Sequence, residues 1–146
     1  MPLDAELLEA YRRALYVVYG APDLVIRIGE RNAALDALLD EDGADTAAYL
    51  SAANPHGALQ DETANELACA ALHQALADAG YTCFAGEGRD PAGHWPAEPS
   101  VLAVGISRRE AMVMGRSYEQ NAIVFIERGK APELVVLLSG ERPPIS

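Results

Sequence analysis

The chain has 146 residues and a formal net charge of −11 at pH 7, because 22 acidic side chains outnumber 11 basic ones. Half of the residues are hydrophobic and 23% are charged, which at this length predicts one globular domain with a sizeable core. The acidic balance argues against a general nucleic-acid binder and against docking on anionic membranes, since both need a basic surface.

The N-terminal residues, the lack of a long apolar run and the cysteines bear on the cellular location of the protein. Residues 1–13 are acidic and amphipathic, which is not typical of a signal peptide, and no apolar run approaches the ~20 residues that a membrane helix needs. We therefore expect a cytoplasmic protein in which Cys69 and Cys83 are reduced. We also expect one domain over residues 1–140 and a loose tail over residues 141–146.

The first half of the chain alternates helical and extended patterns. A helix capped by Asp4 and ending before Gly20 is expected first, and the strongest helical pattern begins at the capping box Thr63-x-x-Glu66. Asn32 caps a short helix. The expected elements are helix 5–19, strand 23–28, helix 33–39, strand 46–53 and helix 62–79.

The region between Gly80 and Gly105 predicts a strand, a turn-rich loop and a second strand. Strand 81–85 is expected to break at Gly86-Glu87-Gly88, whose glycines permit a sharp turn or the close approach of a ligand. Asp90-Pro91-Ala92-Gly93 fits a type I turn, and strand 100–104 follows. We regard this loop as the best candidate for a site, because loops held by rigid strands often carry function.

The last third predicts a helix and a hairpin. The capping box from Ser107 to Glu110 opens a helix over residues 108–117, and strands 122–126 and 133–138 follow. Strands joined by helices can be parallel neighbours. We therefore predict an α+β fold, a single mixed sheet of about five or six strands with helices packed on it, with α/β as the alternative.

No fingerprint of a cofactor, nucleophile or metal site stands out. Gly86-Glu87-Gly88 lacks the third glycine of a dinucleotide site, and no phosphate-binding loop or nucleophile elbow occurs. Asn65, Cys69 and His73 share one helix row, but two soft ligands make a weak metal site. The acidic loop 40–43 is too short for an EF-hand. We expect neither metal nor cofactor.

Several short motifs follow one another in a particular order along the chain. The motifs are Ser51-Ala52-Ala53-Asn54-Pro55, Asn65, Gly86-x-Gly88, Trp95-x-x-Glu98-x-Ser100 and Gln120-x-Ala122. With this order and spacing the chain resembles the bacterial domain of unknown function family 3293 over roughly residues 49–138. The resemblance implies that the polar and aromatic members belong to one pattern, and it implies no reaction.

Residues of these types at element ends could hydrogen-bond and stack a flat polar ligand. We favour a module that binds a small polar ligand, such as a nucleotide or sugar, at loop 86–100. The alternatives are a small hydrolase or transferase with Glu98 as general acid or base, and an acidic protein-interaction domain. The predicted ligand-binding residues are Asn54, Asn65, Gly88, Trp95, Ser100 and Gln120.

The same residues also allow a purely structural interpretation. In that interpretation Trp95 caps one end of the core, Asn54 caps local backbone and Glu98 is solvated. This interpretation predicts that truncating Trp95 or Gln120 only destabilises the protein, by about 3–5 kcal/mol for the aromatic ring if the ring is buried.

Overall fold

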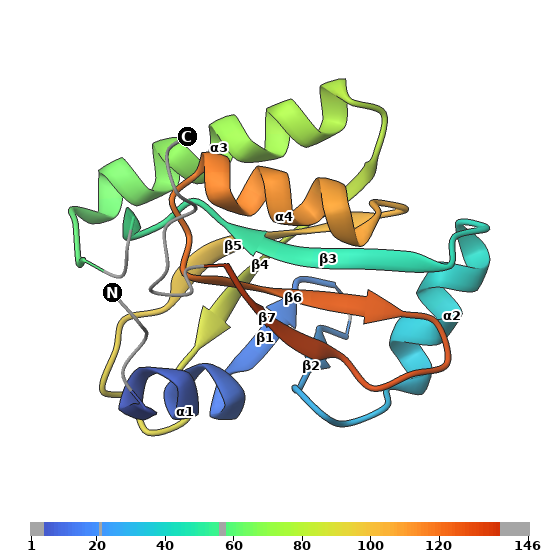
Figure 1. The fold of residues 1–146 in the computed structure, drawn as a ribbon, viewed down its shortest axis with the longest axis horizontal. Coiled ribbons are helices and arrows are strands. Elements are labelled where there is room, and N and C mark those ends of the chain that lie inside the picture. The colour runs from blue at the N-terminus through green and yellow to red at the C-terminus, as the bar shows by residue number, and fades with distance from the viewer. Residues whose placement is uncertain (1–4, 21, 56–57, 138–146) are drawn as a thin grey trace, which may run out of the picture.

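The structure, a computed structural model, describes residues 5–20, 22–55 and 58–137. Helices α3 and α4 lie on one side of a curved sheet, and α1 and α2 lie on the other (Figure 1). The elements in chain order are α1 (Ala5–Arg13), β1 (Leu15–Val18), β2 (Leu24–Ile26), α2 (Ala33–Glu41), β3 (Thr46–Ser51), α3 (Glu62–Asp78), β4 (Thr82–Arg89), β5 (Glu98–Val104), α4 (Arg108–Ser117), β6 (Ala122–Glu127) and β7 (Glu133–Val136).

The predicted α+β class is confirmed, and the sheet differs from the prediction in two respects. It has seven strands in the order β2-β1-β4-β5-β3-β6-β7, where five or six were expected. Every neighbouring pair among these described strands is antiparallel, so the parallel neighbours of a mixed sheet do not form.

The N-terminal segment accounts for the extra strand. The helix predicted over 5–19 ends at Arg13, and Leu15–Val18 instead pairs with β2 on one side and β4 on the other. Its residues Leu-Tyr-Val-Val fit either a helical or an extended pattern, and strand propensity plus pairing on both edges favours the strand. The predicted cap Asp4 and the predicted tail 141–146 lie outside the described residues.

Two apolar clusters form the core, one on each face of the sheet. Alternation along β3 divides its residues between them: Ala48 and Leu50 pack toward α3 and α4, whereas Ala47 and Tyr49 pack on the face that α2 covers. A strand that is buried on both faces has a continuous run of apolar residues. Alanine is a weak β-former, but it is accommodated in β3 because both faces of the strand are covered.

Helix caps follow the sequence with one exception. The side chains of Asn32 and Ser107 accept hydrogen bonds from the backbone N–H groups of Leu35 and Glu110, at 3.0 and 3.1 Å, as predicted. Helix α3, however, is capped by Asp61, which accepts from the Ala64 N–H at 3.3 Å. The capping box predicted at Thr63 is therefore wrong.

Strand β4 continues through the glycines that were expected to break it. Gly86 pairs with Val18 of β1 and with Ser100 of β5, and Gly88 pairs with Tyr16 and Glu98. A Cβ atom on Gly86 would lie 1.9 Å from the backbone oxygen of Val17. This glycine therefore serves a close approach of two strands rather than a turn.

The turn itself lies further on, where the N–H of Gly93 donates to the carbonyl of Asp90 at 3.0 Å. This hydrogen bond confirms the predicted turn over residues 90–93. Strand β5 begins at Glu98, two residues earlier than expected. The early start matters for the site, because it fixes Glu98 in the sheet instead of leaving it in the loop.

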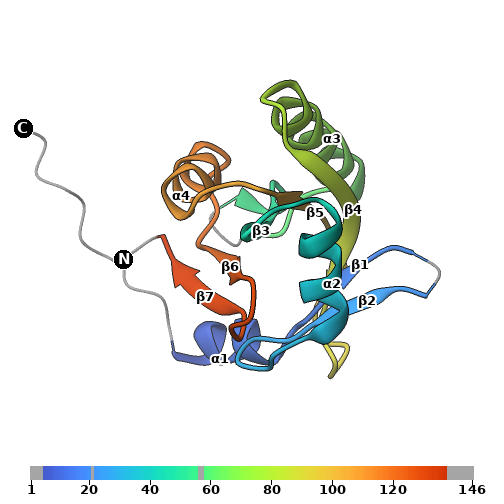
Figure 2. The ribbon, with the colours of Figure 1, turned by 90° about the vertical axis from the view of Figure 1, so that its right-hand side faces the viewer.

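The sheet curls until the segments beyond its two edge strands meet. The N–H of Gly29, after β2, donates to the carbonyl of Pro132, before β7, at 2.9 Å. Figure 2 shows α1 and α2 on the inner side of this curl. Within the described residues, no helix has the length and apolar character needed to cross a membrane.

Candidate functional site

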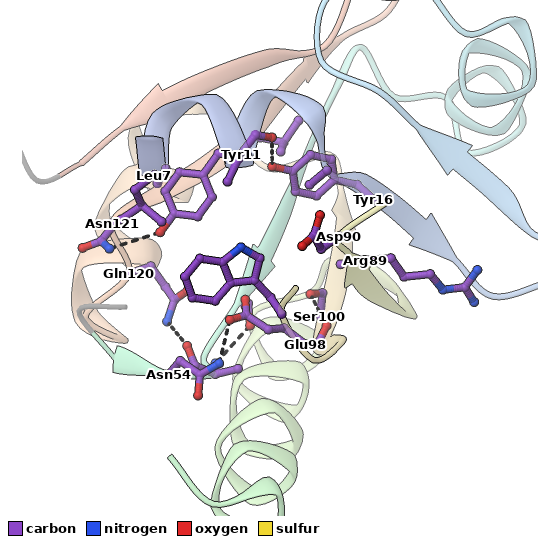
Figure 3. A pocket seen from close by; sticks show the side chains of 18 of the residues that line it. Leu7, Tyr11, Tyr16, Asn54, Arg89, Asp90, Glu98, Ser100, Gln120 and Asn121 are labelled. Atoms are coloured by element: carbon purple, nitrogen blue, oxygen red, sulfur yellow. Dashed lines mark hydrogen bonds between the residues drawn. The ribbon is translucent and has the colours of Figure 1, made fainter. Parts of the chain in front are cut away.

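A pocket of about 530 Å³ lies between α1 and the sheet, at the end of the curl away from α2 (Figure 3). Its walls come from α1, β1, the end of β3, the end of β4, the start of β5 and the segment before β6. Six of the seven residues singled out in the sequence line it: Asn54, Gly88, Trp95, Glu98, Ser100 and Gln120. The fold thus brings together side chains that lie up to 66 positions apart in the chain.

Asn65 is the seventh, and it lies behind the pocket on α3. Its buried side chain accepts from the Asn54 N–H at 2.8 Å and donates to Asn54 Oδ1 at 3.0 Å. The N–H of Gln60 also donates to Asn54 Oδ1, at 2.9 Å. These bonds hold Asn54 in a left-handed conformation, with φ of 46°, which costs energy in a residue other than glycine. Asn65 is therefore a positioning residue for Asn54.

The Asn54 side chain donates a hydrogen bond to the carboxylate of Glu98. With its oxygen occupied, Asn54 turns its side-chain nitrogen to Glu98 and donates to Oε2 at 2.6 Å. Burial raises the pKa of the Glu98 carboxyl above its usual range, and the hydrogen bond from Asn54 opposes that rise in part. None of the described residues donates to the second oxygen, Oε1.

Gln120 presents a second acceptor. Its side-chain nitrogen donates to the backbone carbonyls of Ala53 and Tyr118, at 3.0 and 3.2 Å. Because a carbonyl only accepts, these contacts fix the orientation of the amide. The amide oxygen of Gln120 then has no donor among the described residues.

Ser100 and Gly88 have different parts in the wall. Ser100 is only 4% exposed, and its hydroxyl donates to the backbone carbonyl of Glu98 at 3.0 Å, so it supports the start of β5. Gly88 has no atom within 4 Å of the position where a Cβ would stand, so its side faces open space. The two residues flank Glu98, one along β5 and one across the pair of strands.

Trp95 lies in the loop between β4 and β5 and is 48% exposed although it lines the pocket. The side chain of Asp90 accepts from the N–H groups of Ala92 and His94, at 3.0 and 2.8 Å, and so stabilises the loop that carries it. An indole this exposed does not serve as a cap on the core. It offers an aromatic surface in the same pocket as the half-buried carboxylate of Glu98.

The pocket residues that were not singled out in the sequence include Tyr11, Tyr16 and Asn121. Tyr16 donates its hydroxyl to the backbone oxygen of Tyr11 at 2.5 Å, and Asn121 Nδ2 donates to the Tyr11 hydroxyl at 3.1 Å. Burial raises the pKa of Tyr11, so this hydroxyl keeps its proton at neutral pH. Both tyrosines fall in the range 5–19, which was predicted as a single helix.

Asn121 is the one described residue with a buried side-chain polar atom that lacks a partner. The side chain is 4% exposed, and its Oδ1 receives no hydrogen bond. Reversing the amide would let Tyr11 donate to Oδ1 but would leave Nδ2 unpartnered instead. Either orientation leaves an unmet hydrogen bond at the pocket wall, which costs stability in the free protein.

The charged lining is more acidic than basic. The lining contains four carboxylates and two guanidinium groups. The carboxylates belong to Glu6, Glu9, Asp90 and Glu98, and the guanidinium groups belong to Arg13 and Arg89. Within residues 5–20, 22–55 and 58–137, no three side chains of the types His, Cys, Asp and Glu gather closely enough to hold a metal ion. Cys69 and His73 are therefore not joined by a third side chain of these types in that part of the chain.

The comparison with protein families matches residues 50–123, just over half of the chain, to the family described as protein of unknown function, DUF3293. The chain belongs to this family. The matched range contains all seven residues singled out in the sequence, whereas α1 and β1 lie before it. No curated protein and no solved structure matches the chain. Membership in DUF3293 names no reaction, so function is argued from the pocket.

Proposed function

We propose that the pocket binds a small flat ligand that carries several N–H groups, such as the base of a nucleoside or nucleotide. The observation that carries this proposal is the unmet hydrogen-bonding capacity of the wall. Glu98 Oε1 and Gln120 Oε1 accept from no described residue, while the neighbouring amide nitrogens already donate to the protein. A ligand that fills such a wall must donate.

The shape and charge of the lining support the same class of ligand. Trp95, Tyr11 and Tyr16 surround the pocket with aromatic groups, on which a planar ring could stack. The excess of carboxylates favours a donor-rich or cationic ring over a carboxylate at this position. A free ligand of this kind suits the cytoplasmic location expected from the sequence.

A thermal-shift screen of the purified chain against nucleobases, nucleosides, nucleotides and sugars tests the proposal. A ligand at 100 times its Kd adds roughly 2.7 kcal/mol to the free energy of unfolding, which raises the midpoint by several degrees. Gln120→Ala should abolish the shift. Gln74→Ala, which removes an amide on the outer helix α3, should keep it.

Absence of a shift with every donor-rich ring would contradict the proposal. A shift that Gln120→Ala leaves unchanged would also contradict it, because the ligand would then bind elsewhere. Sugars act as a chemical control, since they carry many donors but no aromatic face for the ring of Trp95.

Catalysis is a second candidate, and one observation favours it. A carboxyl with a raised pKa in a pocket is a common property of a general acid or base, and Glu98 has it. Ser100 does not supply a nucleophile, because its hydroxyl is buried and donates to the backbone. Glu98→Gln separates the two candidates: an enzyme keeps ligand binding and loses turnover of the bound compound, whereas a pure binding module shows no turnover to lose.

A further inference from the structure

A second, shallower hollow of about 340 Å³ adjoins the pocket near the C-terminal end of α1. Its lining includes Arg12, Arg13 and Arg27, together with one carboxylate, that of Glu30. Three guanidinium groups against one carboxylate leave two formal positive charges. In a chain with 22 acidic and 11 basic side chains, this concentration of arginine is unusual and points to an anion.

The three arginines are free to take a ligand. Arg89, Arg108 and Arg128 each pair with an acidic side chain at 3.1 Å or less. By contrast, the guanidinium groups of Arg12, Arg13 and Arg27 make no hydrogen bond or ion pair within the part of the chain that the structure describes. A guanidinium group presents a planar fork of donors that matches the oxygens of a phosphate.

The hollow and the pocket share a wall. Arg13 and Ala14 line both of them, and Pro91 of the hollow follows Asp90 of the pocket in the chain. An anion in the hollow would therefore lie next to a ring in the pocket. The charges of the two linings differ in sign, because carboxylates outnumber guanidinium groups in the pocket and arginines outnumber carboxylates in the hollow.

We propose that Arg12, Arg13 and Arg27 bind a phosphate group, and that this group is the phosphoryl tail of the ligand whose ring occupies the pocket. The second half of this inference rests on the proposed function. It narrows the ligand from a nucleoside to a nucleotide. The first half stands without it, since the arginine hollow can be tested with an inorganic anion alone.

Isothermal titration calorimetry with inorganic pyrophosphate, at low ionic strength, tests the anion site. The unmodified chain should bind it, and Arg27→Ala and Arg12→Ala should each weaken binding by about tenfold or more, as loss of one charge-assisted contact implies. Arg31→Ala is the matched control. It removes the same charge near Arg27 but lines neither cavity, so it should change the affinity by less than about twofold.

Absence of pyrophosphate binding would overturn the inference, as would equal weakening by Arg27→Ala and Arg31→Ala. Binding of pyrophosphate without binding of any ring compound would support the arginine site and contradict the proposed function. A nucleoside that binds as tightly as its 5′-monophosphate would contradict the link between hollow and pocket, while the proposed function would stand. Circular dichroism of each variant confirms that it is folded.

Discussion

Partial burial raises the pKa of the Glu98 carboxyl, and this raised pKa makes the stability of the protein depend on pH. A folded-state pKa above the unfolded value means that the folded protein binds the proton more tightly. Stability from this group is therefore fully present below the unfolded pKa and is lost as the pH rises through the folded pKa. At neutral pH the charged form opposes folding.

Glu98→Gln should accordingly raise the free energy of unfolding at pH 7, by about 0.5–2 kcal/mol, the range typical of relieving a functional site. The amide carries no charge, and its oxygen can still accept from Asn54. Urea denaturation at pH 7 and pH 4 measures the effect, and the gain should shrink at pH 4.

Glu87→Gln is the matched control on the neighbouring strand. The pKa of Glu87 is lowered, chiefly by the hydrogen bond from Arg89 and also by that from Tyr19, so its charged form favours folding. This variant should not gain stability at pH 7. A loss of stability in Glu98→Gln that is the same at both pH values would mean that the carboxylate serves the fold rather than the site.

Gly86 and Gly88 differ in the space around them, although they lie two positions apart on the same strand. A Cβ on Gly86 would collide with the backbone oxygen of Val17, whereas a Cβ on Gly88 meets open space. Gly86→Ala should lower the free energy of unfolding by about 1–3 kcal/mol, as overpacking does. Gly88→Ala should change it by less than about 0.5 kcal/mol. Chemical denaturation measures the free energy of unfolding of both variants. Equal losses of stability would contradict the strand packing described for Gly86.

Among the described helices, α1 has the least burial. None of its residues is buried, whereas α3 buries Asn65, Cys69, Leu72 and Leu76. Two hydrogen bonds to Tyr11, from Tyr16 and Asn121, join it to the sheet and to the segment before β6. Because α1 also forms one wall of the pocket, we expect its local opening to widen the entrance to the pocket.

Hydrogen–deuterium exchange of the free protein should show this difference between helices. Amides of α1 should exchange at least about tenfold faster than the central amides of α3, because local opening requires little burial to be lost. Mass spectrometry of peptides covering residues 5–13 and 62–78 gives the comparison. Equal protection of the two helices would show that α1 is a fixed part of the core.

The sequence predicted most elements because local signals decide them. The caps Asn32 and Ser107, the turn over residues 90–93 and the strand near residues 46–51 follow from residue type and spacing. It did not predict the strand at 15–18, whose apolar run also fits a helix, nor the continuation of β4 past its glycines. Both of these depend on pairing with distant strands, which no local pattern shows.

At the scale of the whole molecule, the sequence predicted one side of the pocket and missed the other. The predicted wall residues fall inside the range that matches DUF3293, where motif order and spacing connect them. Tyr11 meets Asn121 across 110 positions, and that contact exists only once the sheet has curled. The antiparallel pairing of β1 with β2, in which Tyr16 lies opposite Ile26, brings Arg12 and Arg13 next to Arg27. Because the strand at 15–18 was not predicted, the sequence did not reveal the arginine hollow either.

The most direct test of the pocket uses its own fluorophore. The chain has one tryptophan, Trp95, and that residue lines the pocket, so its emission reports on occupancy. Titration with a set of nucleosides and their 5′-monophosphates should give a saturable change in emission for at least one of them. Gly88→Leu, which fills open space in the wall, should abolish the change while the protein stays folded. No saturable change with any compound, or the same change in Gly88→Leu, would contradict a ligand site in this pocket.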